Sequence, residues 1–259
     1  MTNNANVEIT AARADALRAL HTARQMLVLP NAWDAASAKV FEAAGFAAIA
    51  TTSIGIAQSL GFADHEGAPL DEMLAAAARI IRAVTVPVTV DFEAGYGLGP
   101  REIAQRLIAI GAAGMNLEDS DHHGGSRIVD AERHAAHLAA VRAACRDEGV
   151  GLVLNARVDT FVLRLGTAQE QLTEGLRRAR LYKEAGADCI YPITAHEEGD
   201  IRAIVDGLGR APVNVMALPV APPLAKLAAL GVARITFGSQ LMRSALDEAE
   251  RALQAYLAR

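Results

Sequence analysis

The chain has 259 residues, of which 52% are hydrophobic and 21% charged, enough for one large core or two small ones. Its formal net charge is −5 and no block of lysine and arginine stands out, which argues against a nucleic-acid or anionic-membrane partner. No apolar run approaches the ~20 residues of a membrane helix. The N-terminal stretch MTNNANVEIT lacks the basic and apolar regions of a signal peptide, so we expect a cytoplasmic protein.

One unit recurs along the chain: an alanine-rich helical stretch ends at a glycine, and a short apolar strand follows. Glycine supplies the left-handed turn after a helix, and strands this apolar are typical of a parallel sheet covered by helices. In chain order, strands are predicted at 26–29, 48–52, 88–91, 114–118, 152–157, 189–192, 213–216 and 234–237. Helices are predicted at 35–44, 70–84, 101–110, 131–148, 168–184, 201–208 and 223–230, with a longer one at 240–257.

About eight strand–helix units in ~250 residues predict an α/β fold, a single (β/α)₈ TIM barrel domain over residues 1–259. An extra helix at 9–20 precedes the first strand and is expected to cap the bottom of the barrel. The alternative is an open, doubly wound sheet, which would carry a glycine-rich phosphate loop after its first strand. The stretch at that place, LPNAWDAAS, is not such a loop.

Carboxylates follow two neighbouring strands of the predicted barrel. Asp91 and Glu93 end the third strand in PVTVDFEAGYG, and Glu118 ends the fourth. Barrel chemistry belongs at the carboxyl ends of strands, and two acids at i and i+2 repel each other unless a positive group lies between them. Carboxylate oxygens suit Mg²⁺ or Mn²⁺. We predict that Asp91, Glu93 and Glu118 bind a metal; the alternative is that they cap the helices that follow.

Arg157 lies in an otherwise apolar strand, LVLNARVDTFVL. A buried guanidinium needs an anionic partner. A substrate carboxylate, held by two hydrogen bonds, is one candidate, and a structural salt bridge to Glu118 is the other. Asn214, in the seventh predicted strand, is a further candidate for binding substrate.

A long loop is expected at 51–64, TTSIGIAQSLGFAD. Backbone N–H groups near Ser53 could hold an oxyanion, or the segment is an ordinary connection. Asp64 and His65 are the acid–base candidates that this loop carries.

A second loop, DSDHHGGSRIVD, follows the fourth strand. Its composition predicts mobility, and Gly124 and Gly125 could hinge a lid. For His122 and His123 the choice is between solvated side chains and catalysts, and we select His123 as the catalytic candidate. His134 and His137 are predicted to be solvated, and Cys145 and Cys189 to be small core residues. Gly238 and Ser239 are predicted to form either a helix cap or an anion site.

Four stretches, taken together, resemble the isocitrate lyase/phosphoenolpyruvate mutase superfamily, in particular a phosphoenolpyruvate phosphonomutase-like member with a short lid. They are LPNAWDAASAKVFEAAGFAAIATTSIGIAQSLGFAD, VDFEAGYG, LEDS and NARVDTF, in that order within residues 28–239. The resemblance implies a barrel whose terminal helix is swapped between subunits of a homo-oligomer, usually a tetramer. It also implies Mg²⁺ or Mn²⁺ as cofactor and C–C or P–C chemistry beside an enolpyruvate-like fragment of a small carboxylate substrate.

The same resemblance implies roles for individual residues. Asp91 would contact the metal, while Glu93 and Glu118 would hold it directly or through water. Arg157 would bind the substrate carboxylate or the enolate oxygen. Thr52, Ser53 and Ile54 would bind the α-keto acid through backbone and hydroxyl groups. Asp64 would lie near the reacting centre.

The chain departs from this family at the loop after the fourth strand. Isocitrate and methylisocitrate lyases carry a KKCGH-type loop with a catalytic cysteine, whereas DSDHHGGSR has neither lysine nor cysteine. The lysine- and asparagine-bearing lid of the mutase and of phosphonopyruvate hydrolase is missing too, and the usual histidine and glutamate near strand six are Pro192 and Ile193. We therefore expect a Mg²⁺-dependent C–C lyase acting through an enolate on an oxaloacetate-like acid or a substituted malate- or citrate-type acid. The alternatives are a phosphonopyruvate hydrolase or P–C mutase and a non-catalytic binder of small keto acids.

Overall fold

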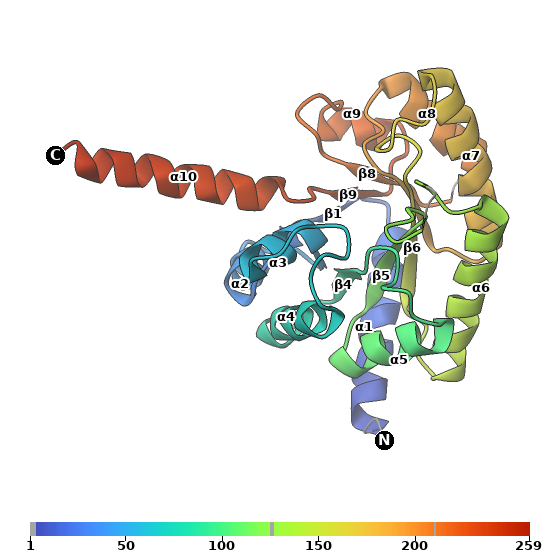
Figure 1. Ribbon diagram of the computed structural model, residues 1–259, viewed down its shortest axis with the longest axis horizontal. Coiled ribbons are helices and arrows are strands. Elements are labelled where there is room, and N and C mark those ends of the chain that lie inside the picture. The colour runs from blue at the N-terminus through green and yellow to red at the C-terminus, as the bar shows by residue number, and fades with distance from the viewer. Residues whose placement is uncertain (1–3, 125–126, 210) are drawn as a thin grey trace.

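The computed structural model describes residues 4–124, 127–209 and 211–259 (Figure 1). Strands and helices alternate along the chain as predicted. The strands are β1 (Leu27–Leu29), β2 (Asn31–Ala32), β3 (Ile49–Thr51), β4 (Val88–Asp91), β5 (Gly114–Glu118), β6 (Val153–Val158), β7 (Cys189–Pro192), β8 (Asn214–Met216) and β9 (Arg234–Thr236). The helices are α1 (Asn4–His21), α2 (Ala35–Ala43), α3 (Ser53–Leu60), α4 (Leu70–Ala83), α5 (Pro100–Ile110), α6 (Ala131–Asp147), α7 (Ala168–Glu184), α8 (Glu198–Leu208), α9 (Leu224–Ala229) and α10 (Gln240–Leu257).

The strands close into a barrel, all of them parallel. Six pair in the order β2-β3-β4-β5-β6-β7 and three in the order β1-β9-β8. β1 and β2 are two halves of one barrel strand on either side of Pro30, so they join the two sheets at one seam. A parallel bridge between Ile190 and Val213 joins them at the other. The predicted (β/α)₈ barrel is confirmed, and the open doubly wound sheet is excluded.

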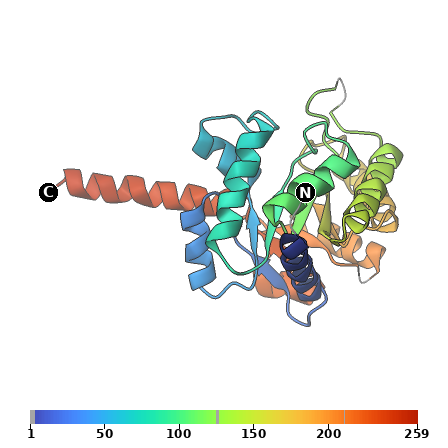
Figure 2. The same ribbon diagram turned by 90° about the horizontal axis from the view of Figure 1, so that it is seen from below.

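Helix α1 covers the amino-terminal end of the barrel (Figure 2). Its Leu17 is fully buried and packs in one cluster with residues at the bottom of the strands, Leu27, Leu29, Ala48, Ala50, Ala113 and Val153. The expected capping helix is therefore confirmed, and within the described residues it starts at Asn4 rather than at residue 9. Because α1 covers the amino-terminal end, the carboxyl end of the barrel is its open face.

Helix α3 corrects the prediction of a long loop at 51–64. The Thr52 side chain accepts a hydrogen bond from the Gly55 N–H as the cap of this helix, and Gly61, at φ 86°, ends it. The helix is only eight residues long and includes Gly55, a poor helix former, so the sequence pattern favours a loop. The solvated position predicted for His134 is also wrong, because α6 turns this side chain inward and only 4% of it is exposed.

Helix α10 projects away from the barrel (Figure 1). Met242 is its buried residue, whereas Leu246, Leu253 and Tyr256 are 57%, 56% and 70% exposed. The swap of this helix between subunits stays a prediction. Within the described ranges, no helix combines the length and the apolar character that crossing a bilayer requires.

Candidate active site

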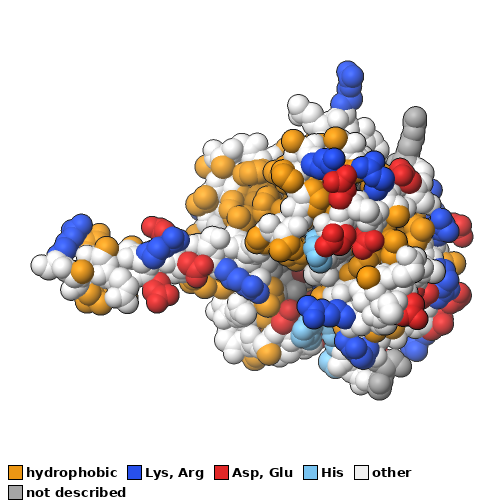
Figure 3. Space-filling model, turned by 90° about the horizontal axis from the view of Figure 1, so that it is seen from above, with side chains coloured by type: hydrophobic (Ala, Val, Ile, Leu, Met, Phe, Trp, Pro, Cys, Tyr) orange, Lys and Arg blue, Asp and Glu red, His pale blue; other side chains and the backbone are white. Residues whose placement is uncertain are grey.

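Ionisable side chains gather around a hollow at the carboxyl end of the barrel, where the space-filling view shows histidine and acidic groups (Figure 3). Asp91 ends β4, Glu118 ends β5 and Arg157 lies in β6. The strand register places Asp91 beside Asn116 and Glu118 beside Arg157. Neighbouring parallel strands thus bring the predicted acids and the predicted arginine to one rim.

Asp91 is held by two donors. Its carboxylate accepts a hydrogen bond from the Ser53 backbone N–H at 3.1 Å and another from the Asn116 side-chain amide at 3.2 Å. Ser53 is the first residue of α3, so the helix directs its amino end at this carboxylate. The N–H groups of Ser53 and Gly55, expected to hold an oxyanion, are therefore already bonded to Asp91 and to the Thr52 hydroxyl.

Glu93 is 3% exposed and adopts a left-handed backbone conformation, with φ 49°. Its carboxylate accepts hydrogen bonds from the Glu66 N–H, at 2.7 Å, and from the Tyr96 hydroxyl. Burial raises the pKa of Glu93 to about 7, an effect that these two hydrogen bonds only partly offset. The charges of Asp91 and Asp64 raise this pKa further, so a cation bound beside Glu93 would favour its ionised form.

Glu118 and Arg157 form an ion pair, and Arg157 also donates from Nε and Nη2 to the two oxygens of Asp159, at 2.7 and 2.9 Å. Burial raises the pKa of Glu118 even though Arg157 acts in the opposite direction. Of the two partners predicted for Arg157, the salt bridge to Glu118 is present in the structure. A role in binding substrate remains a prediction.

A buried network fixes Asp159 from the far side. Asp159 accepts a hydrogen bond from the Ser120 hydroxyl, and its N–H donates to Asp119 at 2.9 Å. Asp119 in turn accepts from Arg178 and Tyr182 of α7, at 3.0 and 2.6 Å. The orientation of the Arg157 guanidinium therefore depends on a chain of bonds that reaches the outer helix layer.

The loop after β5 folds over the rim. The His122 Nε2 lies 2.7 Å from Glu118 Oε1, and the His122 ring packs 5.1 Å from that of His65. His123, 68% exposed, lies 2.7 Å from Glu66. Solvation is thus the wrong interpretation for His122, whose side chain is 9% exposed, and His122 rather than the selected His123 contacts an acid of the rim. Gly125, one of the two predicted hinge residues, lies outside the described residues.

The other predicted substrate contacts lie in different surroundings. Ile54 is half-buried in the first turn of α3, and Asp64 is half-buried close enough to Glu93 to contribute to its raised pKa. Asn214 is fully buried, and its amide bonds the Thr236 hydroxyl on β9 at 3.2 Å. These roles stay predictions, and for Asn214 the geometry is that of a barrel-wall contact.

The acids on the rim fit a divalent cation by donor type and by burial. Oxygen donors from carboxylates are the ligands of Mg²⁺ and Mn²⁺, and a cation would remove the cost of ionising the buried Glu93 and Glu118. In the structure, each of these acids is bonded to protein groups. Among the described residues, no three His, Cys, Asp or Glu side chains are already arranged to coordinate one metal ion. Asp91, Glu93 and Glu118 would have to turn from these partners to hold the ion.

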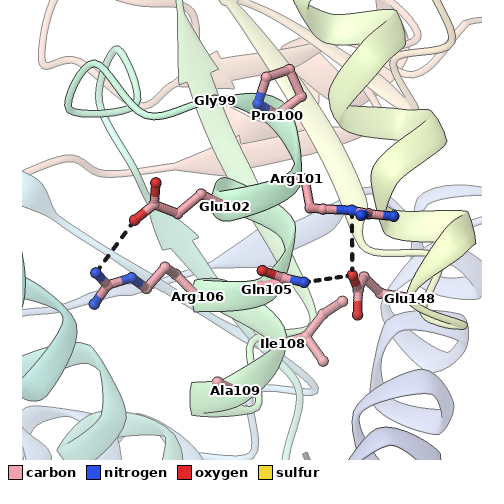
Figure 4. A pocket seen from close by; sticks show the side chains of 9 residues that line it. All are labelled: Gly99, Pro100, Arg101, Glu102, Gln105, Arg106, Ile108, Ala109 and Glu148. Carbon is pink, nitrogen blue, oxygen red and sulfur yellow. Dashed lines mark hydrogen bonds and ion pairs between the residues drawn. The ribbon is translucent and has the colours of Figure 1, made fainter. Parts of the chain in front are cut away.

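One cavity is separate from this rim. It measures about 920 Å³ and lies along α5, where Arg101 and Gln105 face Glu148 and Arg106 faces Glu102 (Figure 4). A second cavity, of about 600 Å³, is lined by residues that follow β6, β7 and β8, among them Phe161, Thr194 and Leu218. The second cavity lies on the carboxyl side of the barrel, so it could accommodate part of a ligand there.

Four neighbours of the predicted site residues have no role in the sequence-based predictions: Glu66, Tyr96, Asn116 and Asp159. The strand period could have indicated two of them, because Asn116 precedes Glu118 by two positions on the same strand face, and Asp159 follows Arg157 by two. Glu66 gave none, since its role depends on how the loop after α3 bends back to Tyr96 and His123.

Comparison with known proteins gives consistent results. A family model described as phosphoenolpyruvate phosphomutase matches residues 17–257. An uncharacterised protein of Mycobacterium tuberculosis is 34% identical over 91% of this chain and 86% of its own. A crystal structure from Burkholderia cenocepacia J2315, provisionally described as a phosphonomutase, is 37% identical, covers 95% of this chain and 99% of its own, and has a TM-score of 0.86.

Two further solved structures have established chemistry in their descriptions. A 2,3-dimethylmalate lyase is 26% identical, with 94% and 86% of the two chains covered and a TM-score of 0.82. A phosphonopyruvate hydrolase bound to oxalate and Mg²⁺ is also 26% identical, with 95% and 87% covered and a TM-score of 0.82. One of these relatives acts on a substituted malate and the other on a phosphonate.

Proposed function

Because this chain belongs to the isocitrate lyase/phosphoenolpyruvate mutase superfamily, we propose that it is a divalent-metal-dependent lyase for a small α-keto or α-hydroxy carboxylate. The bond cleaved is the C–C bond of an oxaloacetate-like acid or of a substituted malate- or citrate-type acid. Cleavage of an oxaloacetate-like acid releases CO₂ and leaves the electron pair beside the keto group as an enolate. Cleavage of an α-hydroxy acid removes the hydroxyl proton, converts that carbon into the keto group of one product, and leaves the electron pair on the other fragment as the enolate of its carboxylate. A proton then converts either enolate into the product.

The observation that carries this proposal is the cluster of Asp91, Glu93, Glu118 and Arg157 on one rim. Three carboxylates and one guanidinium, all largely buried, match an anionic substrate held between a cation and an arginine. A bound Mg²⁺ or Mn²⁺ would polarise the keto group and stabilise the negative charge that develops on its oxygen. Mg²⁺ is present in the phosphonopyruvate hydrolase complex, which supports the choice of ion.

Arg157 would bind the substrate carboxylate. Two of its nitrogens are fixed by Asp159, so the plane of the guanidinium is set before substrate arrives. The remaining nitrogen, Nη1, now pairs with Glu118 and is the one free to exchange that partner for a substrate oxygen. Thr52, Ser53 and Ile54, at the start of α3, would line the keto-acid side of the hollow.

Side chains of the loops over the rim would transfer the proton. Asp64 and His123 are the two candidates, and both lie close to carboxylates of the site. Decarboxylation of an oxaloacetate-like acid needs one proton delivered to the enolate carbon and no leaving-group acid. It therefore suits a loop that lacks the lysine and cysteine of related enzymes.

P–C chemistry on phosphonopyruvate is the second candidate, favoured by the phosphonopyruvate hydrolase among the relatives. A panel of oxaloacetate, substituted malates, methylisocitrate and phosphonopyruvate with Mg²⁺ separates the two. Pyruvate released from the carboxylic acids supports the lyase, whereas phosphate released from phosphonopyruvate supports P–C cleavage. Saturable binding of keto acids without any product would favour a binder instead.

The Asp91→Ala variant tests the role of the rim in turnover. We expect it to lower turnover of the active substrate by at least ~100-fold, because the site loses a ligand for the ion that stabilises the developing charge. The exposed Asp71→Ala variant serves as the control for a lost surface carboxylate. Unchanged turnover in Asp91→Ala would refute the metal-assisted mechanism.

A further inference from the structure

His122 is the residue of the rim that the lyase proposal leaves without a role. Resting on that proposed function, we infer that His122 Nε2 is a ligand of the metal beside Glu118, so that the site takes a mixed nitrogen–oxygen set. The ion it prefers is then Mn²⁺ or another first-row divalent ion that accepts imidazole, in preference to Mg²⁺.

The first support is the contact between the two side chains. His122 Nε2 lies 2.7 Å from Glu118 Oε1, while the other oxygen of Glu118 pairs with Arg157. Two ligand atoms each ~2.1 Å from a metal and at right angles lie ~3 Å apart. The present separation is close to that value, so His122 Nε2 and Glu118 Oε1 already lie about as far apart as two ligand atoms of one ion.

The second support is where the imidazole lies. The His122 side chain is 9% exposed although it belongs to a loop. Its Nε2 contacts the Glu118 carboxylate, the Glu66 carboxylate contacts the next residue, His123, and the ring of His65 packs against the His122 ring at 5.1 Å. The side chain is ordered inside the acidic hollow and does not extend into solvent.

The chemistry of the donor set decides the choice of ion. Mg²⁺ binds oxygen almost to the exclusion of nitrogen, whereas the first-row divalent ions accept an imidazole nitrogen, Mn²⁺ the most weakly and Zn²⁺ more strongly. A site made of carboxylates alone would allow Mg²⁺ to compete with these ions for binding. Adding one imidazole nitrogen shifts the preference toward these other ions.

A competing role for His122 is that of an internal cation that neutralises Glu118 and must leave before a metal enters. The two roles make opposite predictions for His122→Gln. Loss of a ligand weakens metal binding, whereas loss of a competing cation strengthens it. The sign of the change in affinity therefore separates them.

The test uses the whole chain loaded with Mn²⁺. Pulsed electron paramagnetic resonance should show ¹⁴N modulation from one coordinated imidazole in the unmodified protein, and His122→Gln should abolish it. In titration calorimetry, His122→Gln should lose at least ~10-fold in Mn²⁺ affinity and less than ~3-fold in Mg²⁺ affinity. His137→Gln, on α6, is the matched control and should keep both affinities and the ¹⁴N signal.

Each negative result has one meaning. If Mn²⁺ binds and Asp91→Ala abolishes that binding, but the ¹⁴N signal is absent or His122→Gln binds as tightly as before, the inference is wrong and the proposed function stands. If the unmodified protein binds neither Mn²⁺ nor Mg²⁺ at millimolar concentration, the inference about His122 and the proposed function are both wrong. Absence of the ¹⁴N signal from the unmodified protein overturns the inference even if His122→Gln fails to fold.

Discussion

Two residues of the turn after β4 have unusual backbone conformations. Glu93 and Tyr96 are neither glycine nor asparagine, yet their φ angles are 49° and 55°. Such conformations cost roughly 1 kcal/mol or more each and persist where the surroundings hold them. Here the surroundings are the bond from Tyr96 to Glu93 and the bonds that both residues make to Glu66. The turn after β4 is thus strained at the place where it presents a carboxylate to the hollow.

Arg157 gives a sharp prediction at the scale of single residues. Arg157→Lys keeps the positive charge but loses the planar fork that Asp159 holds in two hydrogen bonds. We expect kcat/KM for the active substrate to fall ~100-fold, about 2.7 kcal/mol, because two charge-assisted hydrogen bonds become misaligned. Steady-state kinetics measures this, with Mn²⁺ affinity as the control. A variant with unchanged kcat/KM would show that Arg157 serves the barrel alone.

Among the elements, α6 carries a histidine whose titration should be visible in stability. His134 is buried against Tyr182, and burial lowers its pKa to about 3, with smaller effects from His137 and Arg178. Below pH ~6.5 the unfolded chain binds a proton there and the folded chain does not. The free energy of unfolding therefore falls as pH falls, by about 2 kcal/mol between pH 6.5 and 5 from this group.

The comparison of His134→Gln with the unmodified protein isolates that contribution. Urea denaturation at pH 5, 6 and 7.5 should show a weaker loss of stability toward acid in the variant. His196→Gln, in a partly exposed loop position, is the control and should follow the unmodified protein. Parallel curves for all three proteins would mean that His134 titrates alike in the folded and unfolded states.

The elements also show what a sequence can predict. The predicted range of α7 and of α10 matches the structure to the residue, because apolar periodicity marks both and the Thr167 capping box marks the start of α7, whereas Ser239 makes no side-chain cap hydrogen bond on α10. Helix α3 was missed, since its start is a single threonine cap inside a run of small residues. In the site, the predicted strands were enough to place Asp91, Glu118 and Arg157 together at the carboxyl end of the barrel. The position of His122 depends on how a loop folds back over its own strand, which no local pattern records.

At the scale of the whole molecule, the barrel encloses its own core but α10 leaves a surface uncovered. Leu246 and Leu253 are seven positions apart, two helical turns, so they share one face. An apolar cavity of about 360 Å³ lies where Trp33, Ile56 and Leu60 meet, and Met242 at the base of α10 lies near Gly55 of the neighbouring helix. A helix of eighteen residues with one buried side chain gains little from its own barrel.

We predict that the homo-oligomer expected for this chain covers that surface by packing α10 on a second copy. Leu246→Glu combined with Leu253→Glu should convert the oligomer into species of 27.2 kDa, because two charges would enter an apolar interface. On a solvent-exposed helix the same changes would alter stability by less than about 0.5 kcal/mol. Light scattering after size exclusion measures the mass, and Glu248→Gln, on another face of α10, is the matched control. An unmodified protein that is already monomeric, or an oligomer that survives both substitutions, would show that α10 does not hold subunits together.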